Sequence, residues 1–262
     1  MRGTARTAIL ITCCDRPEAL ERSLPQILAL QGPALVVDDS ADPRSRERHR
    51  RLVEATRAEY LPIPGTRRGL AAALNVGLSV LLADPEIEWV SYFQDDVDVD
   101  SVLLEVMAEV SHPEDAPLVT GHDAAEHEAV STRSTPGGIL YRTKRSCRAT
   151  HLHAHRNYWL AVMPLPTRRL GAPCLEAERP GPGSWSDVDW WIATCSRRAE
   201  SQAARAAPEG HVRVVPGLVR TFFHRAEDSL WGNNQPCGAD PELSRKAIVR
   251  WLSARGGRPG DL

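Results

Sequence analysis

The stretch WVSYFQDDVD, residues 89–98, decides the fold, because a run of strand length ends there in a cluster of carboxylates. The earlier stretch VVDDS, residues 36–40, has the same arrangement. In an open α/β sheet, ligands bind beyond the carboxyl ends of the strands. The two stretches therefore predict strands of one sheet whose ends form a ligand site.

The first hundred residues alternate short apolar runs with helical patterns, which is typical of a parallel sheet with crossover helices. Asp15 and Glu18 form a capping-box pattern at the start of the first helix, and Gly32 ends it. Pro25 should kink or split this helix. We expect a βαβαβαβ series with strands at residues 8–12, 34–37, 60–63 and 89–94 and helices at residues 15–31, 44–58 and 69–82.

The pattern changes beyond Asp100 to that of a mixed α+β half, with a loop rich in Pro and Gly at residues 164–186. The whole chain is expected to form one domain, residues 1–255, followed by a disordered tail at residues 256–262. In the second half we expect helices at residues 101–110, 186–198 and 241–254 and strands at residues 118–121, 138–142, 149–155 and 211–224.

Composition excludes several classes of protein. The 262 residues carry a formal net charge of -2, which gives no general attraction to nucleic acid or to an anionic membrane. The six cysteines include no CxxC pair, so buried thiols are expected rather than a zinc module or a disulfide framework. The apolar runs at residues 8–14 and 69–83 are too short for a signal-peptide core and a membrane span respectively. We expect a cytoplasmic protein without an integral membrane segment.

The carboxylates Asp95, Asp96 and Asp98 provide hard oxygen ligands for Mg²⁺ or Mn²⁺ and leave positions for substrate phosphates. A metal there would accept the charge of a departing diphosphate. The alternative is an acidic turn that caps the next helix at Asp100. Asp38 and Asp39 suit hydrogen bonds to a nucleoside, or else cap the helix that follows them.

These motifs resemble those of a family 2 glycosyltransferase of the GT-A fold. Four stretches match in the right order: residues 10–18, 37–40, 69–77 and 93–96. In the second half the match lies mainly at residues 185–191, WSDVDWW, which resembles the acidic motif of the acceptor site. The resemblance implies a mixed, mainly parallel α/β sheet in which residues 5–100 bind the nucleotide sugar and residues 101–255 bind the acceptor.

The resemblance also implies roles for individual residues. Thr12, Asp39 and an arginine, Arg68 or Arg67, would hold the nucleotide. Asp95 would contact the ribose and Asp96 the metal, and the resemblance leaves open whether the metal's carboxylate pair is Asp95 with Asp96 or Asp96 with Asp98. Asp187 would be the general base that takes the acceptor's proton, with Asp189 as the reserve candidate and capping of a helix as the alternative role. His224 would face the metal or the diphosphate, or else be structural.

The activity implied is a metal-dependent, inverting transfer from a nucleotide diphosphate sugar, with a UDP-sugar as the expected donor. The acceptor is a small molecule, a peptide or a saccharide, and the oligomeric state is not indicated. Because the chain lacks a QxxRW motif, a single transfer is favoured over polymerisation. Gln94 and Ser186 replace residues that are usually acidic. These departures leave open a non-catalytic nucleotide-binding or scaffold protein of the same fold.

A nucleotidyltransferase or a dinucleotide-dependent dehydrogenase would need a glycine-rich turn after the first strand, and residues 12–17 contain no glycine. Alternating histidines at residues 151, 153 and 155 favour strand packing or acceptor contact over a metal site. Four tryptophans could form either a platform for a sugar or part of the core: Trp159, Trp185, Trp190 and Trp191.

Overall fold

The computed structural model describes residues 6–64, 69–123, 129–144, 147–165 and 212–222. The predicted helices at residues 186–198 and 241–254 and the predicted tail at residues 256–262 lie outside this part of the chain. The division into a nucleotide-binding and an acceptor-binding half therefore stays a prediction.

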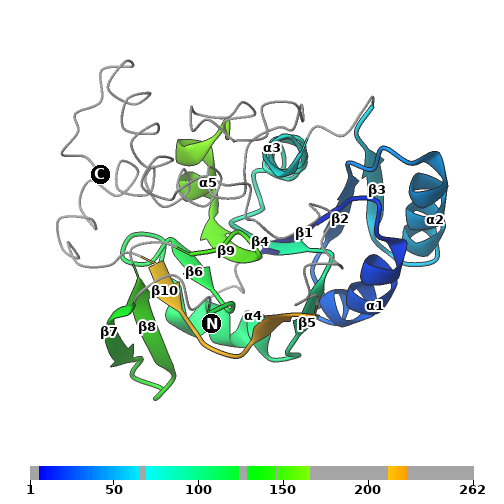
Figure 1. The fold of residues 1–262 in the computed structure, drawn as a ribbon. Helices are drawn as coiled ribbons and strands as arrows, with labels where there is room; N and C mark the ends of the chain where they lie inside the picture. The colour runs from blue at the N-terminus through cyan, green and yellow to red at the C-terminus, as the bar shows by residue number, and fades with distance from the viewer. Residues whose placement is uncertain (1–5, 65–68, 124–128, 145–146, 166–211, 223–262) are drawn as a thin grey trace, which may run out of the picture.

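A central sheet of nine strands runs through the described residues in the order β3-β2-β1-β4-β9-β6-β10-β8-β7 (Figure 1). The four strands of the first half are parallel to one another, as predicted, and β9 is antiparallel to β4. The strands of this sheet are β1 Thr7–Cys13, β2 Ala34–Asp38, β3 Glu59–Pro62, β4 Trp89–Gln94, β6 Leu118–Thr120, β7 Ala129–Ser134, β8 Leu140–Lys144, β9 His151–His155 and β10 Val212–Val214. The predicted mixed α/β sheet is confirmed.

Helices cover both faces of this sheet (Figure 1). One hydrophobic cluster joins Leu10 of β1 to α3 and α5, and another joins Ile9 of the same strand to α1 and α4. Side chains alternate between the two faces along a strand, and the same alternation decides to which face a polar residue at the end of the strand points. The helices are α1 Pro17–Leu28, α2 Pro43–Glu54, α3 Leu70–Leu81, α4 Leu103–Val110 and α5 Arg156–Val162. None of the helices that the structure describes is long and apolar enough to cross a membrane.

The start of α1 differs from the prediction. The N-cap position is Arg16, which makes no side-chain capping bond, and Asp15 has a positive φ of 51°. The predicted capping box is therefore wrong, and the helix begins instead with Pro17, whose fixed φ suits the first turn. Pro25 lies inside one continuous helix, so the predicted split does not occur.

Three short elements were not predicted: β5 Val97–Val99, β7 and α5. The strand β5 pairs with β11 Val219–Thr221 in a separate two-stranded sheet. The single strand predicted at residues 211–224 is two strands among the described residues, because a turn in which Gly217 has φ +89° divides β10 from β11. Such a conformation favours glycine and ends the extended run.

Candidate functional site

The carboxyl ends of β2, β1 and β4 lie side by side, because these strands are parallel neighbours. Cys13 is paired with Asp38, and Thr12 with Gln94. The backbone N–H of Asp39 donates to the Cys13 carbonyl at 3.0 Å. The two predicted acidic stretches therefore meet at one edge of the sheet.

Asp39 lies where β2 meets the start of α3. Its carboxylate is 3% exposed and accepts a hydrogen bond from the backbone N–H of Gly69, the N-cap residue of α3. Gly69 has φ 89°, a conformation that favours glycine. The Asp39 carboxylate therefore lies at the N-terminus of α3, the positive end of the helix dipole. The predicted nucleotide ligands Arg67 and Arg68 precede this helix but lie outside the described residues.

Arg16 binds both carboxylates at the end of β4. Its Nη2 lies 2.6 Å from Oδ1 of Asp95, and its Nη1 lies 3.0 Å from Oδ2 of Asp96. The side chains are 18% exposed for Arg16, 3% for Asp95 and 13% for Asp96. Burial raises the pKa of the Asp95 carboxyl to about 6, although the guanidinium opposes this shift. Sequence reasoning missed Arg16, although its place just past β1 put it at the same edge of the sheet.

The fit of a divalent cation is supported by one oxygen of Asp96. Oδ1 of this residue is buried and has no hydrogen-bond partner among the described residues. A buried carboxylate oxygen without a partner is costly, and a cation would satisfy it. The third predicted ligand, Asp98, lies on β5, and its carboxylate is bound instead by Arg22 and Gln26 of α1.

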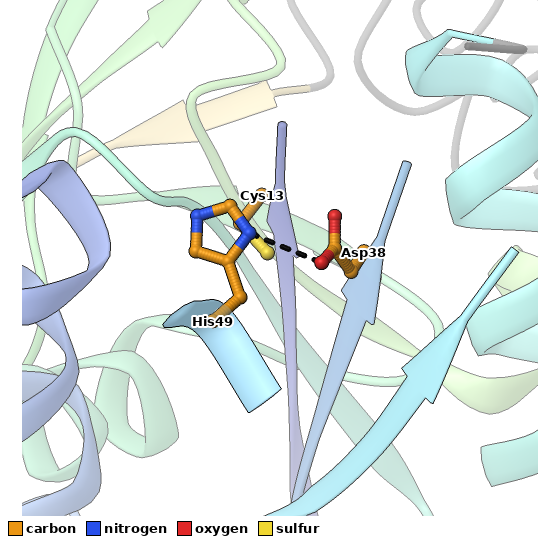
Figure 2. A group of neighbouring side chains, drawn as sticks. All are labelled: Cys13, Asp38 and His49. Atoms are coloured by element: carbon orange, nitrogen blue, oxygen red, sulfur yellow. Dashed lines mark hydrogen bonds and ion pairs between the residues drawn. The ribbon is translucent and has the colours of Figure 1, made fainter. Parts of the chain in front are cut away.

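A cluster of three buried polar side chains lies next to the site, on the face of the sheet that α1 and α2 cover. Figure 2 shows Cys13, Asp38 and His49, whose ligand-type atoms all lie within 4.8 Å of one another. Nδ1 of His49 lies 3.0 Å from Oδ2 of Asp38, which also accepts a hydrogen bond from the Tyr60 hydroxyl at 2.6 Å. Burial raises the pKa of the Cys13 thiol well above its ordinary value, which keeps the thiol protonated.

This group is a hydrogen-bonded support for the strand ends rather than an open site. Burial alone would raise the pKa of Asp38, but the hydrogen bonds that it accepts, above all from His49, outweigh burial and lower it. The other ring nitrogen of His49, Nε2, points away from the carboxylate (Figure 2) and has no hydrogen-bond partner among the described residues. Strand parity explains the arrangement, because Asp38 points to the same face as Val36.

Two residues at the same edge are engaged by the protein itself. The amide of Gln94 donates to the carbonyl of Ala149 at 2.8 Å and is turned toward the chain before β9. The hydroxyl of Thr12 lies 3.0 Å from that of Tyr92. Gln94 therefore stabilises the fold at the position where the resemblance expects a carboxylate. The Thr12 hydroxyl already has a partner in Tyr92, so any hydrogen bond to a nucleotide would be made beside this contact or in its place.

The histidines of β9 pack within the sheet, as favoured from the sequence. His151 accepts a hydrogen bond from the N–H of Gly121 at 2.9 Å, and its Nε2 lies 3.2 Å from the Ser91 hydroxyl. The ring of His153 stacks on Trp89 with centroids 4.8 Å apart. Trp159 is fully buried and belongs to the core. The remaining predicted site residues lie outside the described residues: Asp187, Asp189, His224, Trp185, Trp190 and Trp191.

No protein-family model and no curated protein matches the chain, but solved structures do. The mannosyltransferase PcManGT from Pyrobaculum calidifontis, in complex with GDP-Man and Mn²⁺, is 12% identical with a TM-score of 0.54. The match covers 97% of this chain and 76% of that one. The chain has the GT-A fold. The fold predicted from the sequence motifs is therefore confirmed.

A second GT-A structure gives the same result. Glucosyl-3-phosphoglycerate synthase from Mycobacterium tuberculosis, in complex with Mn²⁺, UDP and phosphoglyceric acid, is 13% identical with a TM-score of 0.54. That match covers 98% of the present chain and 80% of the synthase chain. TarS 1–349 from S. aureus has a TM-score of only 0.48 at 12% identity. The match covers 80% of the present chain, which spans 57% of that TarS chain.

Proposed function

We propose that this protein is a glycosyltransferase that moves a sugar from a nucleotide diphosphate sugar to an acceptor with the help of a divalent cation. The observation that carries the proposal is that Asp39 on one side of β1 and Asp95 and Asp96 on the other follow the ends of parallel strands at the same edge of the sheet. In open α/β sheets such an edge is where ligands bind. The GT-A fold supports the same function, as do the Mn²⁺ ion and the GDP-Man or UDP named for the two neighbouring structures.

Asp39 is proposed to hold the nucleoside, together with Thr12 and with Arg68 or Arg67. Its carboxylate is fixed by the N–H of Gly69, so it is held in place before a ligand arrives. A fixed carboxylate can accept hydrogen bonds from ribose hydroxyls or from the edge of a base. Asp95 is proposed to contact the ribose, since it lies at the same edge of the sheet, at the end of β4 on the other side of β1.

Asp96 is proposed to hold the cation, Mn²⁺ or Mg²⁺, through its unpartnered Oδ1. The cation would accept the charge that develops on the departing diphosphate. His224 is proposed as a further group near the cation or the diphosphate. Asp98 is a weaker proposal, because Arg22 and Gln26 already bind its carboxylate.

Asp187 is proposed as the general base, which makes the transfer inverting. A single carboxylate that takes the acceptor's proton is sufficient for a direct displacement at the anomeric carbon. The donor is proposed to be a UDP-sugar and the transfer non-processive. The acceptor is proposed to be a small molecule, a peptide or a saccharide.

The test is a thermal-shift panel of UDP, GDP, dTDP and CMP, each with Mn²⁺, with Mg²⁺ and with EDTA. A ligand that binds only the folded protein stabilises it by about 2.7 kcal/mol at a concentration of 100 times its Kd. We expect one diphosphate to raise the Tm with metal and to lose most of this effect with EDTA. Absence of any shift across the panel contradicts the proposal.

Three variants make the panel specific. Asp39→Asn should weaken the nucleotide shift with or without metal, whereas Asp96→Asn should remove only its metal-dependent part. Asp84→Asn is the matched control, because Asp84 is an exposed aspartate that pairs with Arg6 on the surface. An equal loss in all three variants would point to general destabilisation.

A non-catalytic protein of the same fold is the second candidate, favoured by the replacement of a carboxylate by Gln94, whose amide binds the backbone. It predicts that nucleotide binding persists while neither hydrolysis nor transfer of any sugar nucleotide is detected. Turnover of the donor that the thermal-shift panel selects, measured as release of the diphosphate, separates the two candidates.

A further inference from the structure

Arg16 lies between two carboxylates of the proposed site that would otherwise repel one another, Asp95 and Asp96. Asp95 and Asp96 are adjacent in sequence and nearly buried, and both are bound by the same guanidinium. When two carboxylates lie close together in a buried site, their mutual repulsion disfavours the charged form of each. An arginine cannot lose its proton in a protein, so Arg16 supplies a permanent positive charge to this pair.

The backbone fixes Arg16 in this place. The residue is the N-cap of α1, lies three residues beyond the end of β1 and is followed by Pro17, whose ring restricts its backbone. The strand next to β1 on this side is β4, whose end carries the two aspartates. The N–H of Cys14, two residues earlier, donates to Oδ2 of Asp95 at 3.5 Å and connects the same two strand ends.

We propose that Arg16 is the resident counter-ion of the Asp95–Asp96 pair and makes cation binding depend on the diphosphate. This inference rests on the proposed function. The guanidinium and the two carboxylates leave one net negative charge, and of the four carboxylate oxygens Oδ1 of Asp96 is the one without a hydrogen-bond partner among the described residues. A divalent cation alone therefore meets a weak site beside a positive charge. A diphosphate brings the negative charge and the oxygen ligands that the protein lacks.

The experiment measures Mn²⁺ binding to the free protein by electron paramagnetic resonance, without nucleotide. Arg16→Gln removes the positive charge, and we expect it to bind Mn²⁺ at least about tenfold more tightly than the wild type, since a unit charge at close range acts strongly on a divalent ion. Arg16→Lys keeps the charge but cannot bridge both carboxylates, so its affinity should lie between the two.

Two controls define the site. Arg48→Gln removes a surface arginine of α2 that pairs with Glu18 and Glu21, and it should leave the affinity for Mn²⁺ unchanged. Asp96→Asn combined with Arg16→Gln should abolish the added affinity. Circular dichroism melts show that each variant is folded, and Arg16→Lys carries the test if Arg16→Gln does not fold.

The dependence on the diphosphate is measured in a second titration, with UDP present at saturation, or with whichever diphosphate the thermal-shift panel selects. The wild type should gain more Mn²⁺ affinity from the diphosphate than Arg16→Gln does. Equal or weaker Mn²⁺ binding by Arg16→Gln without nucleotide overturns the inference, as does an equal gain in both proteins. The titration without nucleotide is independent of turnover, so failure of the glycosyltransferase proposal and failure of this inference are distinguishable.

Discussion

The imidazole of His49 and the carboxylate of Asp38 are both fully buried, with Nδ1 and Oδ2 3.0 Å apart. His49 comes from α2 and Asp38 from the end of β2, so this contact connects a helix to the strand that carries Asp39. The Tyr60 hydroxyl and the N–H of Ser40 complete the shell of donors around the same carboxylate. The position of Asp39 in the site thus depends on a buried polar network one residue away.

Replacement of His49 tests this dependence. We expect His49→Ala to lower the free energy of unfolding by about 2–4 kcal/mol, because it leaves a cavity and removes a donor from a buried carboxylate. His49→Asn, which can place an amide N–H near the position of Nδ1, should lose less. Urea unfolding measures both variants. If His49→Ala unfolds at the same urea concentration as the wild type, the network does not support the strand ends.

Gly77 sets how closely α3 lies on the sheet. A Cβ atom built on Gly77 would lie 2.4 Å from Cδ1 of Leu10 and 3.0 Å from Cγ2 of Val37, both in the closed core. Gly77→Ala should therefore destabilise the protein by about 1–3 kcal/mol through overpacking. Alanine favours a helix over glycine by only about 1 kcal/mol, so the clash determines the sign.

The matched control for Gly77 is Ser79→Ala, an exposed position two residues further along α3. Its substitution should leave the stability within about 0.5 kcal/mol of the wild type. Thermal unfolding of both variants makes the comparison. A Gly77→Ala variant as stable as the wild type would mean that Leu10 can move aside within the core.

The first half of the fold was predictable because each of its strands is a short apolar run with a distinct helical pattern beside it. Residues 89–94, for example, were expected as a strand and form β4. By contrast, β5, β10 and β11 have only three residues each, which is too little pattern to recognise β5 or to separate β10 from β11. Such short strands exist because of pairing with distant segments, and β11 supplies that pairing for β5.

The site was predictable to the level of its acidic strand ends and no further. The sequence indicated Asp39, Asp95 and Asp96, because the carboxyl ends of parallel strands lie at the same edge of the sheet whichever side chains they carry. It did not indicate that Arg16 binds two of them or that Gln94 turns away. Those contacts depend on the direction in which each side chain leaves the backbone, which the pattern of residue types does not contain.

The buried histidines of β9 predict how stability depends on pH. Burial lowers the pKa of His153 to about 3 in the folded protein, against an ordinary value of 6.5. Below pH 6.5 the unfolded chain takes up a proton that the folded protein refuses, so this contribution to stability is present above pH 6.5 and is lost as the pH falls. The loss at pH 5 should be about 2 kcal/mol, from 1.36 kcal/mol for each pH unit.

His153→Phe isolates this effect. Phenylalanine keeps a ring against Trp89, and Nδ1 of His153 has no hydrogen-bond partner among the described residues that the substitution would remove. Urea unfolding at a series of pH values from 7 to 5 should show a shallower loss of stability for the variant than for the wild type. His151, whose pKa burial also lowers, should keep part of the slope in both proteins. Parallel curves for the two proteins would contradict the prediction.

Asp187 supplies the last prediction, which concerns the chemical step. If its carboxylate takes the acceptor's proton, Asp187→Ala should lower kcat by about 10²–10⁴-fold, which is the usual contribution of a general base. The thermal shift given by the nucleotide and metal should persist, because the proposed base contacts the acceptor and not the nucleotide. Asp189→Ala, two residues away in the same motif, is the matched control and should keep most of its turnover. If both binding and turnover are lost, or if neither changes, the assignment of Asp187 fails; if Asp189→Ala alone loses turnover, the base is Asp189.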